Sequence, residues 1–336
     1  MLMPLQIPPS YRPALDLMQT QIAIKEVKDF FQHTLSDILS LTRVTAPLLV
    51  SSDSGLNDNL NGVERPVRFD TRETGEEYEI VHSLAKWKRY ALGRYGFGPG
   101  QGLYTDMNAI RRDEDTDNLH SIYVDQWDWE KVILPCERSM ETLRAAVEDI
   151  YRVLRSTETY VAAKYPALRP VLPPDITFLS SQELEDAYPD LTPHEREEAA
   201  CREYGAVFIT GIGGRLRSGK PHDGRAPDYD DWTLNGDIMV DYPLLGTCIE
   251  LSSMGVRVDA PTLTVQLAER GCSERAGLPF QKALLAGQLP QTIGGGIGQS
   301  RLCMFFLRKA HIGEVQSSVW PEATEQACRE AGIPLL

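Results

Sequence analysis

A glycine-rich segment near the C-terminal end constrains the fold and the chemistry more than any other part of the chain. Residues 292–301 (TIGGGIGQSR) place four glycines in five positions, and Arg301 follows them. Glycines have no Cβ, so a backbone of this kind can approach a flat or phosphorylated ligand closely. The Arg301 guanidinium offers a planar fork of donors to a phosphate or a stacking surface to a base. The pattern predicts a strand over 292–298, then a helix over 299–310, at a nucleotide site.

Charge and cysteine usage exclude several classes of protein. The formal net charge is −14, whereas a large nucleic-acid footprint requires a basic surface, so we expect no nucleic acid partner. No apolar run approaches the roughly 18 residues of a membrane span, and the first residues lack the basic region of a secretory signal. The six cysteines and six histidines are dispersed, without zinc-motif spacing. We therefore expect a cytoplasmic protein without disulfides, zinc or membrane contact.

The spacing of apolar residues predicts an α+β fold with a mostly antiparallel sheet flanked by helices. An N-terminal arm (1–18) precedes a single domain (19–336), because no linker or repeat interrupts the later pattern. The predicted elements are a helix over 18–40, a β-rich run over 41–50 with Pro47 at an edge or interface, a polar loop over 51–62, short strands and turns over 65–130, a helix over 135–164, strands over 175–180, 206–210, 238–242 and 247–251, and helices over 192–204, 261–270 and 279–287.

Two pairs of strands carry acidic side chains. In the hairpin strand after Arg111, alternation puts Gln126 and Asp128 on one face and Asp125 on the other, so one face must be wet or bind a ligand. Asp237 and Glu250 lie within or beside apolar strands. Either could be a satisfied core carboxylate, but a pair near a phosphate-suited glycine turn favours Mg²⁺.

The order of these segments resembles the three motifs of the class II aminoacyl-tRNA synthetase core. They are a helix and strand ending at Pro47, a hairpin entered through Arg111 and Glu114, and a glycine strand followed by Arg301. Longer segments resemble the ammonia-dependent asparagine synthetases, the A-type aspartate–ammonia ligases, over about 20–330. These segments are 82–89 (HSLAKWKR), 123–130 (YVDQWDWE), 225–232 (RAPDYDDW), 250–255 (ELSSMG) and 290–301 (PQTIGGGIGQSR).

The resemblance implies ATP-dependent synthesis of L-asparagine from L-aspartate and ammonia. The reaction would pass through a β-aspartyl adenylate and release AMP and pyrophosphate. Arg111 would stabilise the charge on the α-phosphate, and Asp237 and Glu250 would bind Mg²⁺. The remaining ATP-binding positions implied are Glu114, Gly294, Gly295, Gly296, Gly298 and Arg301.

The resemblance also assigns the amino-acid site. Lys88 and Arg257 would bind the aspartate carboxylate that is not activated. Its ammonium group would meet one of Ser83, Asp125 or Asp128, and Ser252 and Ser253 complete the implied set. Asp58 would take a proton from ammonium while Gln126 orients the reacting carbonyl. From the residues alone, Asp58 could be a turn residue and Gln126 a strand surface residue.

Two further expectations accompany the resemblance. The helix and the Pro47 strand imply a homodimer, and Asp228 or Asp231 is expected near the ribose or near Arg225. The alternative enzyme is an aspartyl- or asparaginyl-tRNA synthetase, which would need an anticodon-binding domain and basic surface. A third possibility is a non-catalytic amino-acid-binding paralogue, which would usually have lost Arg111, Asp58 or Glu250. A glutamine-fed synthetase would need a nucleophilic cysteine, and Met1 and Leu2 offer none.

Overall fold

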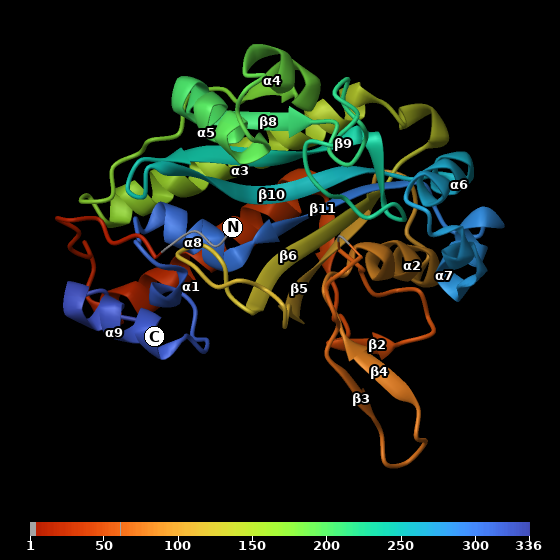
Figure 1. The fold of residues 1–336 in the computed structure, drawn as a ribbon, viewed down its shortest axis with the longest axis horizontal. Coiled ribbons are helices and arrows are strands. Elements are labelled where there is room, and N and C mark those ends of the chain that lie inside the picture. The colour runs from red at the N-terminus through yellow and green to blue at the C-terminus, as the bar shows by residue number, and fades with distance from the viewer. Residues whose placement is uncertain (1–4, 61) are drawn as a thin grey trace.

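The computed structural model describes residues 5–60 and 62–336, and within them an eight-stranded sheet forms the centre of the molecule (Figure 1). The strand order is β1-β5-β6-β11-β10-β9-β8-β7. The bounds are β1 (Leu41–Arg43), β5 (Gly102–Ile110), β6 (Tyr123–Val132), β7 (Thr177–Ser180), β8 (Ala206–Thr210), β9 (Asp230–Tyr242), β10 (Thr247–Arg257) and β11 (Thr292–Gly298). All neighbours pair antiparallel except β1–β5 and β7–β8 at the two edges. The predicted mostly antiparallel α+β sheet is confirmed.

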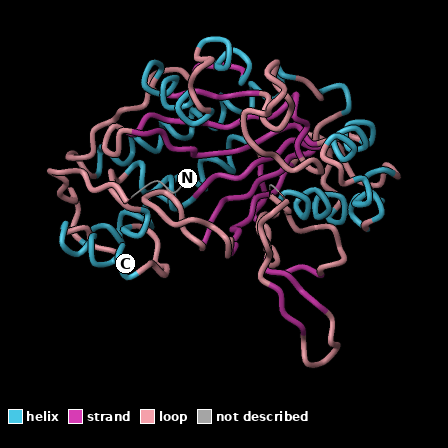
Figure 2. The backbone as a smooth tube through the Cα atoms, in the orientation of Figure 1, coloured by secondary structure: helices cyan, strands magenta, loops and turns pink. Residues whose placement is uncertain are grey.

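Helices α1 (Leu17–Leu39), α3 (Met140–Lys164) and α8 (Gln299–Phe306) cover one face of the sheet, and the helices flank the strands in Figure 2. Alternation along β6 sends Trp127 and Trp129 to this face, where both are fully buried. Phe31 of α1 stacks on Trp127 with ring centroids 4.8 Å apart. Asp16 caps α1 and Ser139 caps α3, so both helices begin where their sequences provide an N-cap. The main hydrophobic core lies here.

Helices on the opposite face leave a space above the centre of the sheet. Helix α2 (Ala85–Tyr95) contacts β6 and β11, while α5 (Pro193–Tyr204) contacts β8, β9 and β10. Helix α4 (Ser181–Ala187) packs beside α5, and α6 (Ala260–Glu269) and α7 (Pro279–Leu285) extend this side near α2 (Figure 1). Polar side chains of β6 and β10 face the space between α2 and α5, which is where a ligand can reach the sheet.

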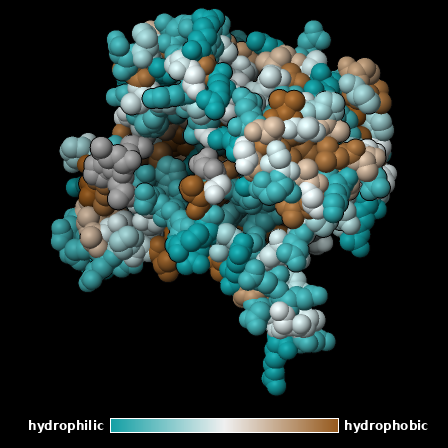
Figure 3. Space-filling view, turned by 45° about the vertical axis from the view of Figure 1, so that its right-hand side comes forward, coloured by the Kyte–Doolittle hydropathy of each residue, from teal (hydrophilic) through white to brown (hydrophobic). Residues whose placement is uncertain are grey.

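Two smaller parts are attached to the central sheet and its helices. Strands β2 (Leu49–Ser51), β3 (Arg68–Asp70) and β4 (Glu77–Ile80) form a second sheet that projects from the molecule and ends in a hydrophilic tip (Figure 3). At the other side, the N-terminal arm packs near α9 (Glu322–Ala331). The Tyr11 side chain is buried there, and its hydroxyl donates a hydrogen bond to Glu314. The described part of the arm is therefore anchored to the C-terminal segment.

Several predicted boundaries were wrong. The run 41–50 is split between two sheets, with Pro47 between β1 and β2, and β9 begins at Asp230. Helix α8 ends at Phe306 because the chain turns at Arg308, which has a positive φ of 53°. Helices α4 and α2 were both missed, and α2 lies in the interval 65–130, where only short strands and turns were predicted. In the structure Lys86, Lys88 and Arg89 are buried.

Candidate active site

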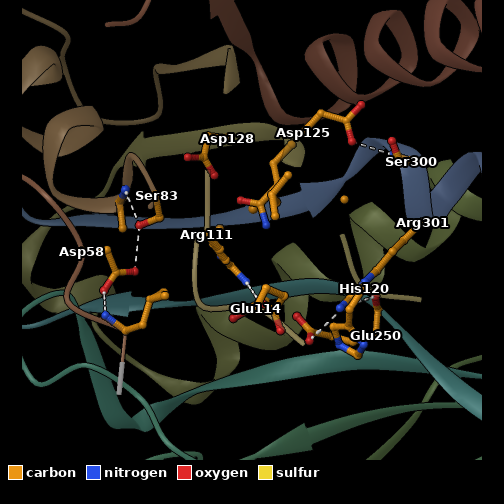
Figure 4. Close-up of a pocket in the computed structure, with 18 of the residues that line it drawn as sticks. Asp58, Ser83, Arg111, Glu114, His120, Asp125, Asp128, Glu250, Ser300 and Arg301 are labelled. Carbon is orange, nitrogen blue, oxygen red and sulfur yellow. Dashed lines mark hydrogen bonds and ion pairs between the residues drawn. The ribbon is translucent and has the colours of Figure 1, made fainter. Parts of the chain in front are cut away.

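A cavity of about 230 Å³ lies on the open face of the sheet, between α2 and the loop before β9. It brings together most of the residues predicted from the sequence. Those that line it are Asp58, Ser83, Lys88, Arg111, Glu114, Asp125, Gln126, Asp128, Glu250, Ser253, Arg257, Gly295, Gly296, Gly298 and Arg301. Figure 4 shows Asp58 and Ser83 at one end of the cavity, Glu250 and Arg301 at the other, and Arg111 between them.

A network of buried charges forms the floor of the cavity. The Arg257 guanidinium donates to both carboxylate oxygens of Glu130, at 2.8–3.1 Å, and pairs with Asp230. Lys88 lies beside Glu130 and 3.3 Å from Asp128, and its Nζ donates to the Gly295 carbonyl at 2.8 Å. All five residues are at most 2% exposed, so each charge requires the others.

The cations of this network favour the ionised form of Glu130. Burial alone would raise the pKa of Glu130, but Arg257 and Lys88 outweigh it and hold that pKa below its usual value. Burial lowers the pKa of Lys88 despite Asp128, whereas Glu130 and Asp230 outweigh burial and raise the pKa of Arg257. Lys88 and Arg257, the two cations predicted to bind the substrate carboxylate, both line the cavity and already have carboxylate partners. A bound substrate carboxylate would share these cations with those partners.

The glycines of β11 make room for this network. A Cβ on Gly294 would collide with the Glu130 carboxylate and would lie 2.8 Å from Arg257 Nη2. On Gly296, a Cβ would lie 2.6 Å from the Gln126 side-chain oxygen. Side chains of β6 and β10 thus lie across β11 at Gly294 and Gly296, where this strand has no side chain. The glycines were expected to serve only the approach of a ligand, and Gly294 instead lies behind the charge network, outside the lining of the cavity.

The loop bearing Asp58 is fixed by polar side chains. Ser83 donates to Asp58 Oδ2 at 2.8 Å, and the Leu60 amide donates to Oδ1 at 2.8 Å. The Asn57 side-chain oxygen accepts hydrogen bonds from the amides of Asp58 and His82. Asp58 is only 3% exposed, yet it lines the cavity. It is therefore both a turn residue and a cavity residue, so the two interpretations left open by the sequence are compatible.

The other end of the cavity is more open and its charges are less tightly paired. Arg111 Nη1 lies 3.9 Å from Glu114, and Arg301 Nη1 lies 3.3 Å from Glu250. The Glu250 side chain is 40% exposed. A cluster of two arginines with exposed donors suits a polyphosphate, which needs several charge-assisted hydrogen bonds.

Asp237 lies close to this end without lining the cavity. It pairs with Arg225 at 2.5 Å, and Arg225 also donates to Ser253. Burial raises the pKa of Asp237 to about 7; Arg225 opposes this rise, and the nearby charge of Glu250 adds to it. The predicted pair of metal ligands is thus close enough to interact electrostatically. Ser252 also lies outside the lining, where its hydroxyl donates to the Gly296 carbonyl.

The two strand carboxylates predicted to meet an ammonium group already have partners. Asp125 accepts a hydrogen bond from the Ser300 amide at 3.0 Å and pairs with Lys28 at 3.0 Å. Asp128 accepts one from the Leu84 amide at 3.1 Å, in addition to its contact with Lys88. Both line the cavity and could accept a further donor, because an ionised carboxylate has about four acceptor positions.

The loop before β9 contributes residues that the sequence did not single out. Arg225, Tyr229 and Asp230 line the cavity. Asp228 and Asp231, expected near the ribose or Arg225, point elsewhere: Asp228 pairs with Lys86, and Asp231 pairs with Arg138. That expectation was wrong, because these two acids pair with other cations, the buried Lys86 and the partly buried Arg138. Glu130 was also missed, although it continues the alternation of Gln126 and Asp128 along one face of β6.

The fold is that of the class II aminoacyl-tRNA synthetase core. The chain is similar to asparaginyl-tRNA synthetase from Pyrococcus horikoshii complexed with asparaginyl-adenylate, with a TM-score of 0.66, 14% identity, and coverage of 90% of this chain and 70% of that one. It is also similar to aspartyl-tRNA synthetase from Entamoeba histolytica, with a TM-score of 0.60, 14% identity, and coverage of 88% and 58%. At these identities the likeness shows the fold alone.

Sequence similarity narrows this class to one family. The aspartate–ammonia ligase family profile matches residues 18–332. The chain is 62% identical over 331 residues to an aspartate–ammonia ligase of Clostridium perfringens strain 13, covering 98% of each, and 59% identical over 327 residues to one of Fusobacterium nucleatum, covering 97% and 100%. The chain belongs to the aspartate–ammonia ligase family, and the resemblance seen in its motifs is confirmed.

Replacing Gly294 tests whether the missing side chain at this position makes room for the Glu130–Arg257 ion pair. Gly294→Ala should lower the free energy of unfolding by about 1–3 kcal/mol, the usual cost of overpacking, because the new methyl displaces the Glu130–Arg257 pair. Gly277→Ala is the matched control, since a Cβ at that position meets nothing within 4 Å. Urea unfolding of both variants measures the difference. Equal stability of the two variants would contradict this packing.

Proposed function

We propose that this chain makes L-asparagine from L-aspartate and ammonia, using ATP to form a β-aspartyl adenylate and releasing AMP and pyrophosphate. Family membership supports the overall reaction. One observation supports the route: a single cavity joins the Arg111 and Arg301 end to the Asp58 and Lys88 end. A nucleotide and an amino acid bound at these ends would meet beside Arg111.

Activation of the side-chain carboxylate is the first step. A carboxylate is a poor electrophile, so its oxygen attacks the α-phosphorus of ATP and pyrophosphate leaves. Negative charge gathers on the α-phosphate during this step, and the Arg111 guanidinium is placed to stabilise it. Arg301 and Glu114 would contact the outer phosphates or the base of ATP. Gly295, Gly296 and Gly298 have no side chains on the wall of the cavity, which would leave room for the nucleotide.

The Asp237 and Glu250 carboxylates fit Mg²⁺, which prefers oxygen ligands and usually binds through one or two carboxylates together with substrate phosphates. Glu250 is the freer of the two, because Asp237 is engaged by Arg225. When bound there, the ion would neutralise charge on the phosphate oxygens. Arg225 would then balance the remaining charge of Asp237.

Aspartate would bind at the charged floor. Lys88 and Arg257 would hold its α-carboxylate, leaving the side chain directed toward Arg111. Asp125, Asp128 or Ser83 would accept hydrogen bonds from its ammonium group, and Ser253 would complete the wall with Ser252 behind it. Because the floor is fixed before substrate binds, little reorganisation is required to orient the reacting carboxylate.

Ammonia attacks in the second step. At neutral pH most ammonia is protonated, so a carboxylate at the attack site must bind ammonium and accept its proton. Asp58 is buried, lines the cavity and has its orientation set by Ser83 and Leu60. Gln126 lies on the same wall as Asp128 and would orient the carbonyl under attack. The C–O bond to the adenylate then breaks, and AMP leaves.

Two other functions fit the observations less well. A tRNA synthetase needs a basic surface, and this chain has a net charge of −14. A non-catalytic amino-acid-binding paralogue has no reason to keep Arg111, Asp58 and Glu250 around one cavity. All six cysteines are free, which suits work in a reducing cytoplasm, and no helix of the described residues is long and apolar enough to cross a membrane.

The product nucleotide tests the proposed route. Incubation with ATP, Mg²⁺ and aspartate, with and without ammonium, should give asparagine, AMP and pyrophosphate in equal amounts only when ammonium is present. Aspartate-dependent exchange of pyrophosphate into ATP should occur without ammonium, because adenylate formation precedes it. Formation of ADP and phosphate would instead indicate acyl-phosphate chemistry.

Asp58→Asn separates the two steps. Asparagine formation should fall by about 10²-fold or more, because the amide cannot accept a proton from ammonium, while pyrophosphate exchange should be nearly unchanged. Asp53→Asn is the control, since Asp53 lies exposed in the same loop. Equal loss of both activities in Asp58→Asn would move this residue to substrate binding.

We also propose that the protein is a homodimer with α1 and the segment before β2 at the interface. Leu17, Met18 and Ile22 of α1 are 45–64% exposed, and Leu48 and Leu49 are 50% and 38% exposed, so burying them would be favourable. Sedimentation at micromolar concentration should give twice the chain mass of 37.6 kDa. A species of 37.6 kDa would contradict the dimer.

A further inference from the structure

Metal-ligating side chains gather beside the proposed active site, between α5 and β10. The ligand atoms of His194, Glu197 and Cys248 all lie within 4.8 Å of one another. His194 and Glu197 occupy the first turns of α5, while Cys248 lies on β10, two residues before Glu250. None of the three lines the cavity described above. They form a separate cluster of one imidazole, one carboxylate and one thiol.

We propose that His194, Glu197 and Cys248 bind a Zn²⁺ ion, with water as the fourth ligand. Zinc takes N, O and S donors in tetrahedral sites, with bonds of roughly 2.0–2.3 Å, so its ligand atoms stand roughly 3.3–3.8 Å apart. The observed spacing requires only small side-chain rotations to reach that geometry. The His194 side chain is 43% exposed, which leaves a route for the ion and a position for the water. Mg²⁺ would be a poor occupant, because it prefers oxygen ligands alone.

A second layer of side chains supports these ligands. His222 Nε2 lies 2.9 Å from Glu197 Oε1, so the imidazole orients the carboxylate as outer partners of metal ligands commonly do. His222 is only 3% exposed, and its Nδ1 has no hydrogen-bond partner among the described residues. The buried Cys201 thiol contacts the Cys248 thiol. Both thiols also pack in an apolar cluster between α5 and the sheet, so packing accounts for their burial. A metal ion would in addition use the Cys248 thiol together with the imidazole and the carboxylate.

The proposed site would connect α5 to two segments that also shape the active site. His222 lies three residues before Arg225, and Cys248 shares strand β10 with Glu250. A zinc ion would therefore tie the loop before β9, through His222 and Glu197, to the sheet. The dispersed cysteines and histidines predicted no zinc site, because these ligands come from segments far apart in the sequence.

Metal titration of the whole protein tests the proposal. The chain would be stripped with chelator, supplied with excess Mg²⁺ to occupy oxygen-ligand sites, and titrated with Zn²⁺ and separately with Co²⁺. We expect one equivalent of each to bind, and Co²⁺ to show thiolate-to-metal charge-transfer absorption. Cys248→Ser should lose that absorption, and His194→Ala should lose stoichiometric binding. His222→Ala should weaken binding by about 10–100-fold.

Cys136→Ser is the matched control, because Cys136 is exposed and lies outside the cluster. It should bind zinc as the wild type does. Far-ultraviolet circular dichroism verifies that each variant is folded. Because His194 is partly exposed, we expect His194→Ala to fold, so the test remains valid even if Cys248→Ser is unstable. The proposal is overturned if the wild type binds no zinc under these conditions. It is equally overturned if folded His194→Ala binds zinc as tightly as the wild type, since the cluster would then be only an ion pair beside two thiols.

Discussion

The buried ion pair between Arg257 and Glu130 is the constraint on which the site depends. It joins β10 to β6 across the intervening β11, so the strand between them must be bare at Gly294. Removing either partner would leave a buried charge uncompensated, which typically costs about 3–5 kcal/mol. Lys88 and Asp230 extend the pair to α2 and to the start of β9. This one set of charges therefore holds the central strands, α2 and the start of β9 in their relative positions.

The two ends of the cavity differ in how firmly their side chains are held. At the Asp58 end, each carboxylate oxygen of Asp58 accepts a hydrogen bond, and the Asp58 amide donates one to the Asn57 side chain. At the Arg301 end, the ion pairs are longer and Glu250 is partly exposed. This contrast suits a reaction in which a small amine must be placed accurately, whereas a large polyphosphate brings its own charges and can order the arginines that bind it.

The sequence predicted the fold class from local patterns, and it predicted about half of the residues that line the cavity, most of them through the family resemblance. Alternation along β6 and the glycines of β11 define adjacent antiparallel strands, and adjacency in the sheet brings Gln126 and Gly296 together. Helix α2 was missed because its cations are neutralised by partners remote in sequence, such as Asp228 for Lys86. The same difficulty hid Glu130 and Asp230. Burial of a charge depends on a partner that only the tertiary structure supplies, so residue type alone did not predict that these side chains are buried.

Labelled oxygen atoms distinguish the adenylate route from its alternatives. In the proposed reaction, the aspartate side chain is joined to the α-phosphate within one cavity and is then released from it by ammonia. Aspartate labelled with ¹⁸O in both β-carboxylate oxygens should transfer one labelled oxygen to AMP for each asparagine formed, and the other should remain in the amide, as phosphorus-31 NMR and mass spectrometry can detect. AMP without the label, in the presence of normal asparagine formation, would contradict the account.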